Sequence, residues 1–360
     1  MDTRTIERLF SADDHVDIGH DRIKAHLASR FHDDYDKALA AFRLSLGQKP
    51  STPSNNTSLD PSRSNPRALA GHTDPAARIK DMDVDGVWAS ATYCEVSAYR
   101  YLYMLERGAR EATRAFNLAL AEFASVDPAR LIVSYQIPIA NIDDAVKEVE
   151  TVAANGGKSL QLPVYPTELD QPDYWHERYD PLWSIIQETG LPICCHIGQN
   201  SMLNPLARRD PTPKRAIMLP ILNMSTAEAF GMWIMGGVFE RFPRLKVVFV
   251  EPGIGWVAWW LYMVDDMVRR QGYELPAISE LPSHYFHQNV HLTFIDEPDA
   301  VQHMRYRLGV DNLLWSSDYP HPVSSWPSSR KVVDDMFTGV PDAERRLMLY
   351  GNAARVWNLA

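Results

Sequence analysis

The feature that most restricts how this chain can fold is a regular alternation of short apolar runs with longer helical patterns. Each apolar run has the length of a buried strand, and apolar residues at helical spacing follow it. Beyond residue 75, strands are predicted within Asp81–Tyr93, Leu131–Pro138, Lys158–Val164, Leu191–His196, Leu245–Glu251, Val290–Ile295 and Asn312–Asp318. Helices are predicted at Tyr99–Val126, Ile142–Ala154, Tyr179–Thr189, Leu219–Gly236, Trp256–Gln271, Pro298–Leu308 and Ser328–Ala360. This order predicts an α/β protein with a parallel sheet.

A short alternating run at Thr5–His15 raises the number of predicted strands to eight. Eight strands, each followed by a helix, fit a closed (β/α)8 TIM barrel better than an open doubly wound sheet. No GxGxxG turn indicates a dinucleotide-binding fold. We therefore expect residues 1–360 to form a single barrel domain, whose chemistry lies at the carboxyl ends of its strands.

An insertion of different composition follows the first predicted strand. Asp21–Ser45 has an amphipathic helical pattern, whereas residues 47–76 are rich in Ser, Pro, Asn and Thr. Such a segment has too few apolar residues for a core element. We predict a loop and helix insertion here, with residues 47–76 forming a long flexible loop or lid. His72, within that loop, is expected to face solvent.

The overall composition excludes several classes of partner. The net charge is −10 and no cluster of Lys and Arg offsets it, so we expect no nucleic-acid partner. The N-terminus lacks the apolar core of a signal peptide, and no apolar run is long enough to cross a membrane. The three cysteines, Cys94, Cys194 and Cys195, form neither a disulfide framework nor a CxxC pair. These features predict a cytoplasmic protein with no membrane partner.

The stretch LLWSSDYPHPVSSWP, residues 313–327, carries the clearest functional signal. An apolar run ends at Asp318, and His321 follows in a loop that contains two prolines. A carboxylate at a strand end with an imidazole three residues later suits metal binding or proton transfer. The alternative is structural: Asp318 caps the next helix and His321 is a surface residue.

Three other strand ends carry similar residues. The first strand ends in Asp13-x-His15, which places both side chains on one face and Asp14 on the other. Asp and His are also common in turns and caps, so this pair alone is a weak signal. His196 ends the fifth predicted strand and Glu251 the sixth. Because all these ends meet at one barrel mouth, we expect the residues to surround a Zn, Mn or Fe ion.

Other polar and aromatic residues are weaker candidates. Glu95 follows the second strand, where a surface position is expected, and Gln161 can face the barrel interior or point outward. Tyr319 and Trp326 can line a pocket for an apolar or aromatic substrate. The remaining histidines are expected to be structural: His20, His26, His32, His176, His284, His287, His291 and His303.

The chain resembles the amidohydrolase superfamily, in the branch that contains aminocarboxymuconate-semialdehyde and resorcylate decarboxylases. The matching stretches are SADDHVD, LPICCHIG, GGVFERFPRLKVVFVEPGIGW, LLWSSDYPHPVSSWP and YGNAARVWNL. The resemblance implies a barrel of the metal-dependent hydrolase type. It also implies metal ligands at Asp13, His15, His196 and Asp318, around an ion that activates water or orients a carboxylated substrate.

Two departures from the family pattern bear on the metal. Many members have His-x-His on the first strand, where this chain has Asp13-x-His15, and Glu251 stands where a histidine is common. Both changes favour harder ions than Zn²⁺. Glu251 can orient His196, act as a general base, or bind a second ion together with His321.

We therefore expect a metal-dependent hydrolase or decarboxylase acting on a small organic acid, amide or ester. Asp318 would carry the proton, assisted by His321 or Glu251, and no organic cofactor is expected. One alternative is an oxygenase with two Fe or Mn ions, as in related dinuclear members of the superfamily. Another is a non-catalytic scaffold subunit of a related active partner. The resemblance also implies a dimer or higher oligomer, formed with itself or with a related subunit.

Overall fold

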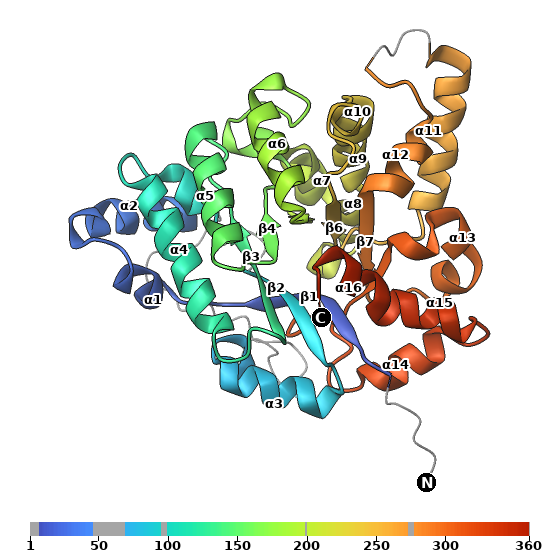
Figure 1. Ribbon diagram of the computed structural model, residues 1–360, viewed down its shortest axis with the longest axis horizontal. Helices are drawn as coiled ribbons and strands as arrows, with labels where there is room; N and C mark the ends of the chain where they lie inside the picture. The colour runs from blue at the N-terminus through green and yellow to red at the C-terminus, as the bar shows by residue number, and fades with distance from the viewer. Residues whose placement is uncertain (1–6, 46–68, 95–98, 199, 273–276, 360) are drawn as a thin grey trace.

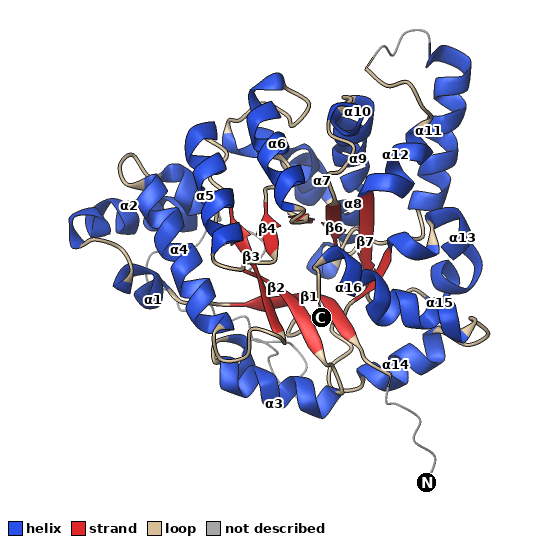
Figure 2. Cartoon of the chain, viewed as in Figure 1, coloured by secondary structure: helices blue, strands red, loops and turns tan. Residues whose placement is uncertain are grey.

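The computed structural model describes residues 7–45, 69–94, 99–198, 200–272 and 277–359. Its strands form one eight-stranded sheet in the sequential order β1 to β8, and each described pairing between neighbours is parallel. Helices surround the strands on the outside (Figures 1 and 2). The strands are β1 (Phe10–Val16), β2 (Ala89–Cys94), β3 (Leu131–Gln136), β4 (Ser159–Gln161), β5 (Ile193–His196), β6 (Val247–Val250), β7 (Val290–Phe294) and β8 (Leu313–Trp315).

The helices follow the strands in the expected alternation. Those before β5 are α1 (His20–Ala25), α2 (His32–Ser45), α3 (Pro75–Asp85), α4 (Ala109–Ala124), α5 (Ile142–Ala154) and α6 (Asp180–Thr189). Between β5 and β7 lie α7 (Asn204–Arg209), α8 (Met218–Met224), α9 (Thr226–Met235), α10 (Val238–Arg241), α11 (Val257–Gln271) and α12 (Pro282–Asn289). The last are α13 (Arg305–Leu308), α14 (Ser329–Met336), α15 (Asp342–Arg346) and α16 (Asn352–Val356).

The ends of the helices follow ordinary capping chemistry. Asp74 caps α3 by accepting a hydrogen bond from the Ala77 N–H at 2.8 Å, and Asn141 caps α5 in the same way. A cap of this kind stabilises a helix by about 1 kcal/mol. Gly86 and Gly190 end α3 and α6 with φ of 73° and 70°, a conformation that favours glycine. Local sequence therefore sets where these helices begin and end.

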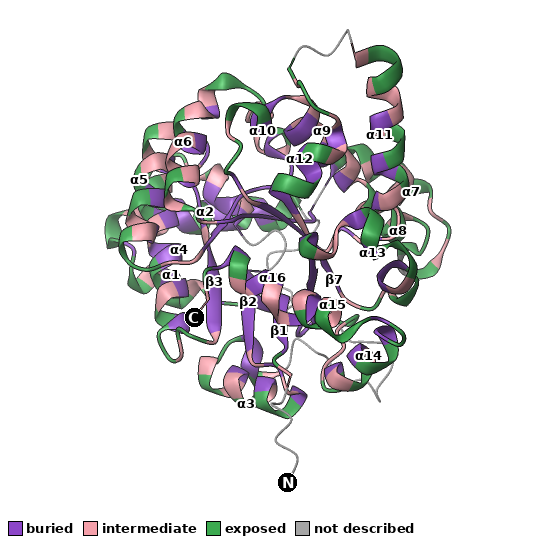
Figure 3. Ribbon diagram, turned by 45° about the vertical axis from the view of Figure 1, so that its right-hand side comes forward, coloured by how far each residue is buried: buried purple, intermediate pink, exposed green. Residues whose placement is uncertain are grey.

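The sheet closes into a barrel through the segment that follows β8. The Asp318 N–H donates to the Asp13 carbonyl at 2.8 Å, and the His15 N–H donates to the Tyr319 carbonyl at 2.6 Å. The strands are buried except for the half-buried Tyr135 and His291, while the exposed surface belongs mainly to the helices and loops (Figure 3). The predicted (β/α)8 barrel, with helices inserted after the first strand, is confirmed.

The barrel interior contains apolar side chains toward its amino end and polar ones toward its carboxyl end. The apolar residues include Phe10, Ala12, Ala89, Ala91, Ile132, Val248, Val250 and Leu314. Helix α16 covers the amino end, where the ring of Trp357 stacks on Phe10 with centroids 5.2 Å apart. The candidate functional side chains lie at the opposite, carboxyl end of the barrel.

The insertion after β1 contains α1, α2 and a short 3-10 turn, Ala70–His72, that leads into α3. Most of the predicted flexible loop, residues 47–68, lies outside the described residues. The expectation for His72 is wrong, because its exposure is only 4%. The chain passes beside β1 here, and the His72 carbonyl accepts the Asp17 N–H at 2.9 Å.

Within the described part of the chain, no helix combines the length and apolar character needed to cross a bilayer.

Candidate metal centre

Strand β1 brings Asp13 and His15 to the same side, as the strand period predicts. Both side chains have no exposed surface, and Asp13 Oδ1 lies 3.5 Å from His15 Nε2. The pairing of β1 with β2 shifts register between Ser11 and Asp14, so the strand is irregular just where these residues begin. Irregularities of this kind re-aim side chains near functional sites.

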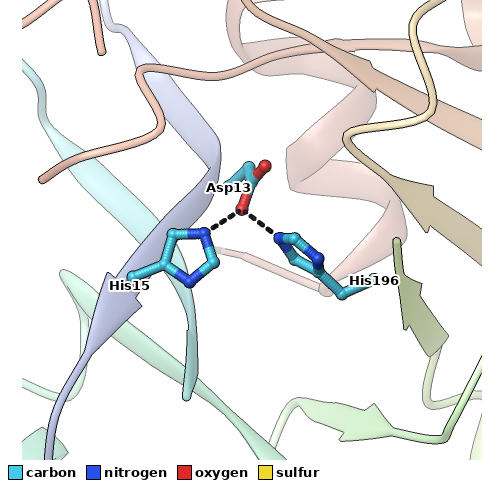
Figure 4. A group of neighbouring side chains, drawn as sticks. All are labelled: Asp13, His15 and His196. Carbon is cyan, nitrogen blue, oxygen red and sulfur yellow. Dashed lines mark ion pairs between the residues drawn. The ribbon is translucent and has the colours of Figure 1, made fainter. Parts of the chain in front are cut away.

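His196 reaches the same place from the end of β5. Its Nε2 lies 3.4 Å from Asp13 Oδ1, so that Asp13 stands between two imidazoles contributed by different strands (Figure 4). Its Nδ1 donates to the Ile197 carbonyl at 2.8 Å, which leaves Nε2 facing the carboxylate. Burial lowers the pKa of His196, but the charges of Asp13 and Glu251 raise it to about 9. The surroundings of this ring are therefore strongly negative.

Asp318 and His321 come from the segment that closes the barrel. Asp318 has φ of 54°, in the left-handed region that non-glycine residues seldom adopt. Its Oδ1 lies 3.1 Å from His15 Nε2 and 2.9 Å from His321 Nδ1. The rings of His15 and His321 stack with centroids 3.8 Å apart. The unusual backbone conformation at Asp318 accompanies a side chain placed between two histidines.

Glu251, immediately after β6, is the second strand-end acid with a left-handed backbone, at φ of 59°. Its N–H donates to Thr293 Oγ1 at 2.8 Å, and its carbonyl accepts from Asn223 Nδ2 at 3.1 Å. Its Oε2 lies 3.8 Å from His196 Nε2. Burial, and then the charge of Asp318, raise the pKa of Glu251 to about 8. A cation beside it would favour the ionised carboxylate.

The predicted site residues therefore meet at one place, and we call these six residues the donor cluster: Asp13, His15, His196, Glu251, Asp318 and His321. Three overlapping groups bring candidate ligand atoms within 4.8 Å of one another, namely Asp13–His15–His196, His15–Asp318–His321 and Asp13–Glu251–Asp318.

The donor cluster also fits a metal chemically. Among the described residues, no group forms a regular hydrogen bond with either carboxylate oxygen of Asp13 or Asp318, or with His196 Nε2. Buried polar atoms normally have such partners, so these atoms lack what a cation would supply. Mixed carboxylate and imidazole donors suit Mn²⁺, Fe²⁺ or Zn²⁺.

A second set of polar residues supports the donor cluster, and the sequence did not reveal it. Asp14 points away from the cluster, and its Oδ1 accepts from the hydroxyls of Ser11 at 2.8 Å and Ser317 at 2.7 Å. The fully buried Arg78 lies 3.4 Å from Asp14 Oδ2 and donates to the His15 and Gly71 carbonyls. A buried guanidinium thereby ties α3 to the backbone that carries the β1 donors.

Two predicted pocket residues belong to this support instead. The Tyr319 ring lies under the Arg78 guanidinium, 4.3 Å from centroid to carbon, and its hydroxyl donates to Asp81. The Trp326 indole N–H donates to the Asp81 carbonyl at 3.2 Å. Both side chains thus hold the β8 loop against α3.

Of the weaker candidates, Gln161 faces the barrel interior. Its Oε1 accepts from Gln136 Nε2 at 2.7 Å, and both side chains are buried near the carboxyl ends of β3 and β4. Glu95 lies outside the described residues. Among the histidines expected to be structural, His20 contacts the Tyr35 hydroxyl at 2.8 Å.

A cavity of about 310 Å³ adjoins the donor cluster on the side of β6 and β7. We call it the mouth cavity; its lining residues are Asn223, Glu251, Gly253, Thr293, Phe294, Ile295, Asp296, Glu297 and Val323. Glu251 belongs to both the donor cluster and the cavity wall. The cavity therefore provides room for a small molecule directly beside the candidate metal ligands.

Comparison with known proteins agrees with this arrangement. Residues 74–359 match the family described as amidohydrolase. The chain belongs to the amidohydrolase family. This membership confirms the expectation of a metal-dependent enzyme of the hydrolase or carboxy-lyase class that acts on a small molecule.

Several solved structures of amidohydrolase type share the fold. An amidohydrolase from Mycobacterium avium subsp. paratuberculosis is 21% identical, with a TM-score of 0.77 over 98% of both chains. The 5-carboxyvanillate decarboxylase LigW from Sphingomonas paucimobilis is 20% identical, with a TM-score of 0.73 over 98% of this chain and 100% of the other. A dihydroxybenzoic acid decarboxylase from Polaromonas sp. JS666, determined with bound manganese and the inhibitor 2-nitroresorcinol, is 16% identical, with a TM-score of 0.71 over 98% of both chains.

Proposed function

We propose that this amidohydrolase acts as a single-domain enzyme that hydrolyses or decarboxylates a small organic acid, amide or ester at one divalent cation. The cation would be held by the four fully or nearly fully buried donors from β1, β5 and the β8 loop: Asp13, His15, His196 and Asp318. The observation that carries this proposal is the convergence of these buried carboxylate and imidazole atoms within 4.8 Å of one another. Manganese is the preferred ion, because two carboxylates make the set harder than a purely histidine site.

A cation bound here would supply Lewis-acid activation of a substrate oxygen or of water. The protein's own residues would then handle the protons. Asp318 would accept a proton at Oδ1, where His321 Nδ1 at 2.9 Å orients the carboxylate and can share the proton. Glu251, which faces both the donor cluster and the mouth cavity, would hold or release a proton next to the substrate.

Hydrolysis and decarboxylation can use the same metal-binding residues, so the two reactions must be distinguished by analysis of their products. Decarboxylation is supported by the activities of two enzymes of similar structure, the 5-carboxyvanillate and dihydroxybenzoic acid decarboxylases. We expect CO₂ release without incorporation of oxygen from labelled water if the chain is a decarboxylase. Incorporation of labelled oxygen into the product would identify a hydrolase.

A second ion is supported by the two donors that the first ion does not require. Glu251 and His321 each form a candidate group with Asp318, Glu251 together with Asp13 and His321 together with His15. Two Fe or Mn ions in this cluster would be compatible with oxygenase chemistry, the alternative function. That alternative predicts about two ions per chain and consumption of O₂ with substrate.

The experiment that tests the proposal is metal analysis of the purified full chain, compared with Asp318→Asn and His196→Ala. We expect about one Mn²⁺ per wild-type chain and loss of the ion and of turnover in both variants. Wild-type protein that retains no Mn²⁺, Fe²⁺ or Zn²⁺ after equilibration would contradict the proposal and favour the scaffold alternative. Far-UV circular dichroism of the variants checks that the fold is retained.

We further propose that the enzyme is cytoplasmic and associates with copies of itself or with a related subunit. Self-association is supported by α11, where Trp259, Tyr262 and Met263 form an exposed apolar stripe at helical spacing. The buried thiols of Cys194 and Cys195 suit a reducing compartment. Light scattering of the wild type and of Trp259→Glu tests the assembly, which is expected to weaken in the variant.

A further inference from the structure

The mouth cavity has a markedly uneven distribution of charge. Three of its lining residues are carboxylic acids, Glu251, Asp296 and Glu297, whereas none of the described lining residues is a lysine or arginine. The remaining wall is apolar or neutral, with Phe294, Ile295 and Val323 among its members. The described lining residues therefore supply negative charge without a compensating basic side chain.

Most of the polar groups in this wall are already engaged with the protein. The Glu297 carboxylate accepts the Ile254 N–H at 2.9 Å and the Gly255 N–H at 3.0 Å, and so fixes the loop after β6. Thr293 Oγ1 and Asn223 Nδ2 both bind the Glu251 backbone. These contacts fix the shape of the cavity wall.

Two carboxyl groups remain to face a ligand. Glu251 lies at the inner end, with ligand oxygens within 4.8 Å of those of Asp13 and Asp318. Asp296 follows the end of β7 and is exposed, beside Val323, which is 61% exposed at the outer wall. A cation held by the fully buried Asp318 would lie next to this inner end and offset its negative charge, which leaves Asp296 as the uncompensated carboxylate.

We propose that the mouth cavity receives a positively charged or neutral hydrogen-bond-donating arm of the substrate, such as an amine, amidine or amide, and that Asp296 determines this specificity. This inference rests on the proposed function, since the reacting group would sit at the donor cluster while the arm extends past Glu251. A carboxylate on this arm would meet like charge at Asp296. The substrate is therefore not an acid with an anionic arm on this side.

The proposal is tested with three probes of similar size and different charge: benzamidine, benzyl alcohol and benzenesulfonate. Their binding to the Mn²⁺-loaded full chain is measured by calorimetry, because none of the three needs turnover. We expect benzamidine to bind tightest and benzenesulfonate weakest. Asp296→Asn should weaken benzamidine by about fivefold, the upper range for an exposed ion pair, and leave benzyl alcohol within about twofold.

Two matched variants establish where the probes bind. Asp299→Asn removes an exposed carboxylate three residues away that does not line the cavity, and it should leave all three affinities unchanged. Val323→Trp fills the cavity from an exposed position and should weaken benzamidine and benzyl alcohol together. Unchanged benzamidine binding in Asp296→Asn or in Val323→Trp would overturn the proposal.

The proposal would also be overturned if benzenesulfonate bound the wild type as tightly as benzamidine, or if benzamidine did not bind the Mn²⁺-loaded chain. Manganese content, measured on the same preparations, separates the two levels of inference. Protein that binds Mn²⁺ but shows no preference for the cationic probe contradicts only the role of Asp296. Protein that binds no Mn²⁺ contradicts the proposed function itself.

Discussion

The two sides of the barrel mouth are built differently. On the side of β1 and β8, Asp13, His15 and Asp318 have no exposed surface. Across the barrel closure, the Asp318 N–H donates to the Asp13 carbonyl and the His15 N–H donates to the Tyr319 carbonyl. On the side of β6 and β7, Glu251 borders a cavity of about 310 Å³, and its side chain is 18% exposed. The first side is enclosed by protein, and the second is open to a ligand.

This difference indicates a division of roles within one constellation. The enclosed side has supporting hydrogen bonds behind its donors, from Ser11, Ser317 and Arg78, which keep the ligand atoms in place. The open side has a wall of loops whose shape can vary without disturbing those donors. Metal binding and substrate selection should therefore respond to different substitutions, which the following predictions test.

The largest effect is expected on the enclosed side, for Asp318→Asn. The substitution keeps the shape of the side chain but removes a charge from the metal site, and turnover should fall by about 10³-fold, equivalent to several kcal/mol of transition-state stabilisation. Steady-state kinetics measure the turnover, and Mn²⁺ titration measures the affinity of the site for the ion. Because buried carboxylates repel one another without a cation, the metal-free variant should be at least as stable to urea as the metal-free wild type. A marked loss of stability would indicate that Asp318 acts mainly as a structural residue.

The next effect concerns the support behind the enclosed side. Arg78→Met should lower the free energy of unfolding by about 3–5 kcal/mol, because it leaves the buried Asp14 carboxylate without its cation. The matched control is the double variant with Asp14→Asn, which removes the stranded charge and should recover part of the loss. Urea denaturation of the metal-free proteins measures these differences. Equal losses in the single and double variants would show that the ion pair is not the cause.

A smaller effect is expected where the open side meets the donor cluster. Glu251→Gln should reduce kcat by about 100-fold through loss of a proton-transfer group, while one Mn²⁺ remains bound with affinity within a few-fold of wild type. Metal analysis and kinetics on the same sample give both values. Loss of the only bound ion in this variant would remove the distinction between the two sides, and loss of one of two ions would support a dinuclear centre.

The smallest effect is expected at His291, which lies near the start of β7, at the opposite end of the strands from the barrel mouth. Burial, then the charges of Lys246 and Arg355, lower the pKa of His291 at the start of β7 to about 4. An unfolded chain takes up this proton below about pH 6.5, whereas the folded protein takes it up only below about pH 4. The free energy of unfolding therefore decreases as the pH is lowered from about 6.5 to about 4. Between pH 7 and pH 5, wild type should lose about 2 kcal/mol more stability than His291→Gln. Urea titrations at both pH values provide the check, and parallel losses would contradict it.

The enclosed side of the mouth was largely predictable from the sequence. Apolar runs that end in Asp13-x-His15 and Asp318 mark the carboxyl ends of parallel strands, as the runs before His196 and Glu251 do elsewhere at the mouth, and barrel geometry brings such ends together. The strand period also placed Asp14 on the opposite face from its neighbours. These inferences needed only local patterns and one rule of topology.

The support and the cavity could not be predicted, for physical reasons. Arg78 lies on a helix 64 residues from Asp14 in the sequence. An amphipathic pattern does not indicate which residue will pair with a buried guanidinium. The left-handed backbones of Glu251 and Asp318 occur at non-glycine residues, where sequence gives no signal. The shape of the mouth cavity depends on loops after three different strands. His72 was misplaced because composition describes a whole segment, whereas burial is decided by the single turn that leads into α3.

The closure of the barrel has a consequence for how the protein is made. Asp13 is synthesised about 300 residues before Asp318, its backbone hydrogen-bond partner. At common rates of translation, the nascent chain spends tens of seconds with its first strand lacking one neighbour. The proposed set of four donors is incomplete during that interval, so an ion that requires Asp318 would be acquired after synthesis of the last strand.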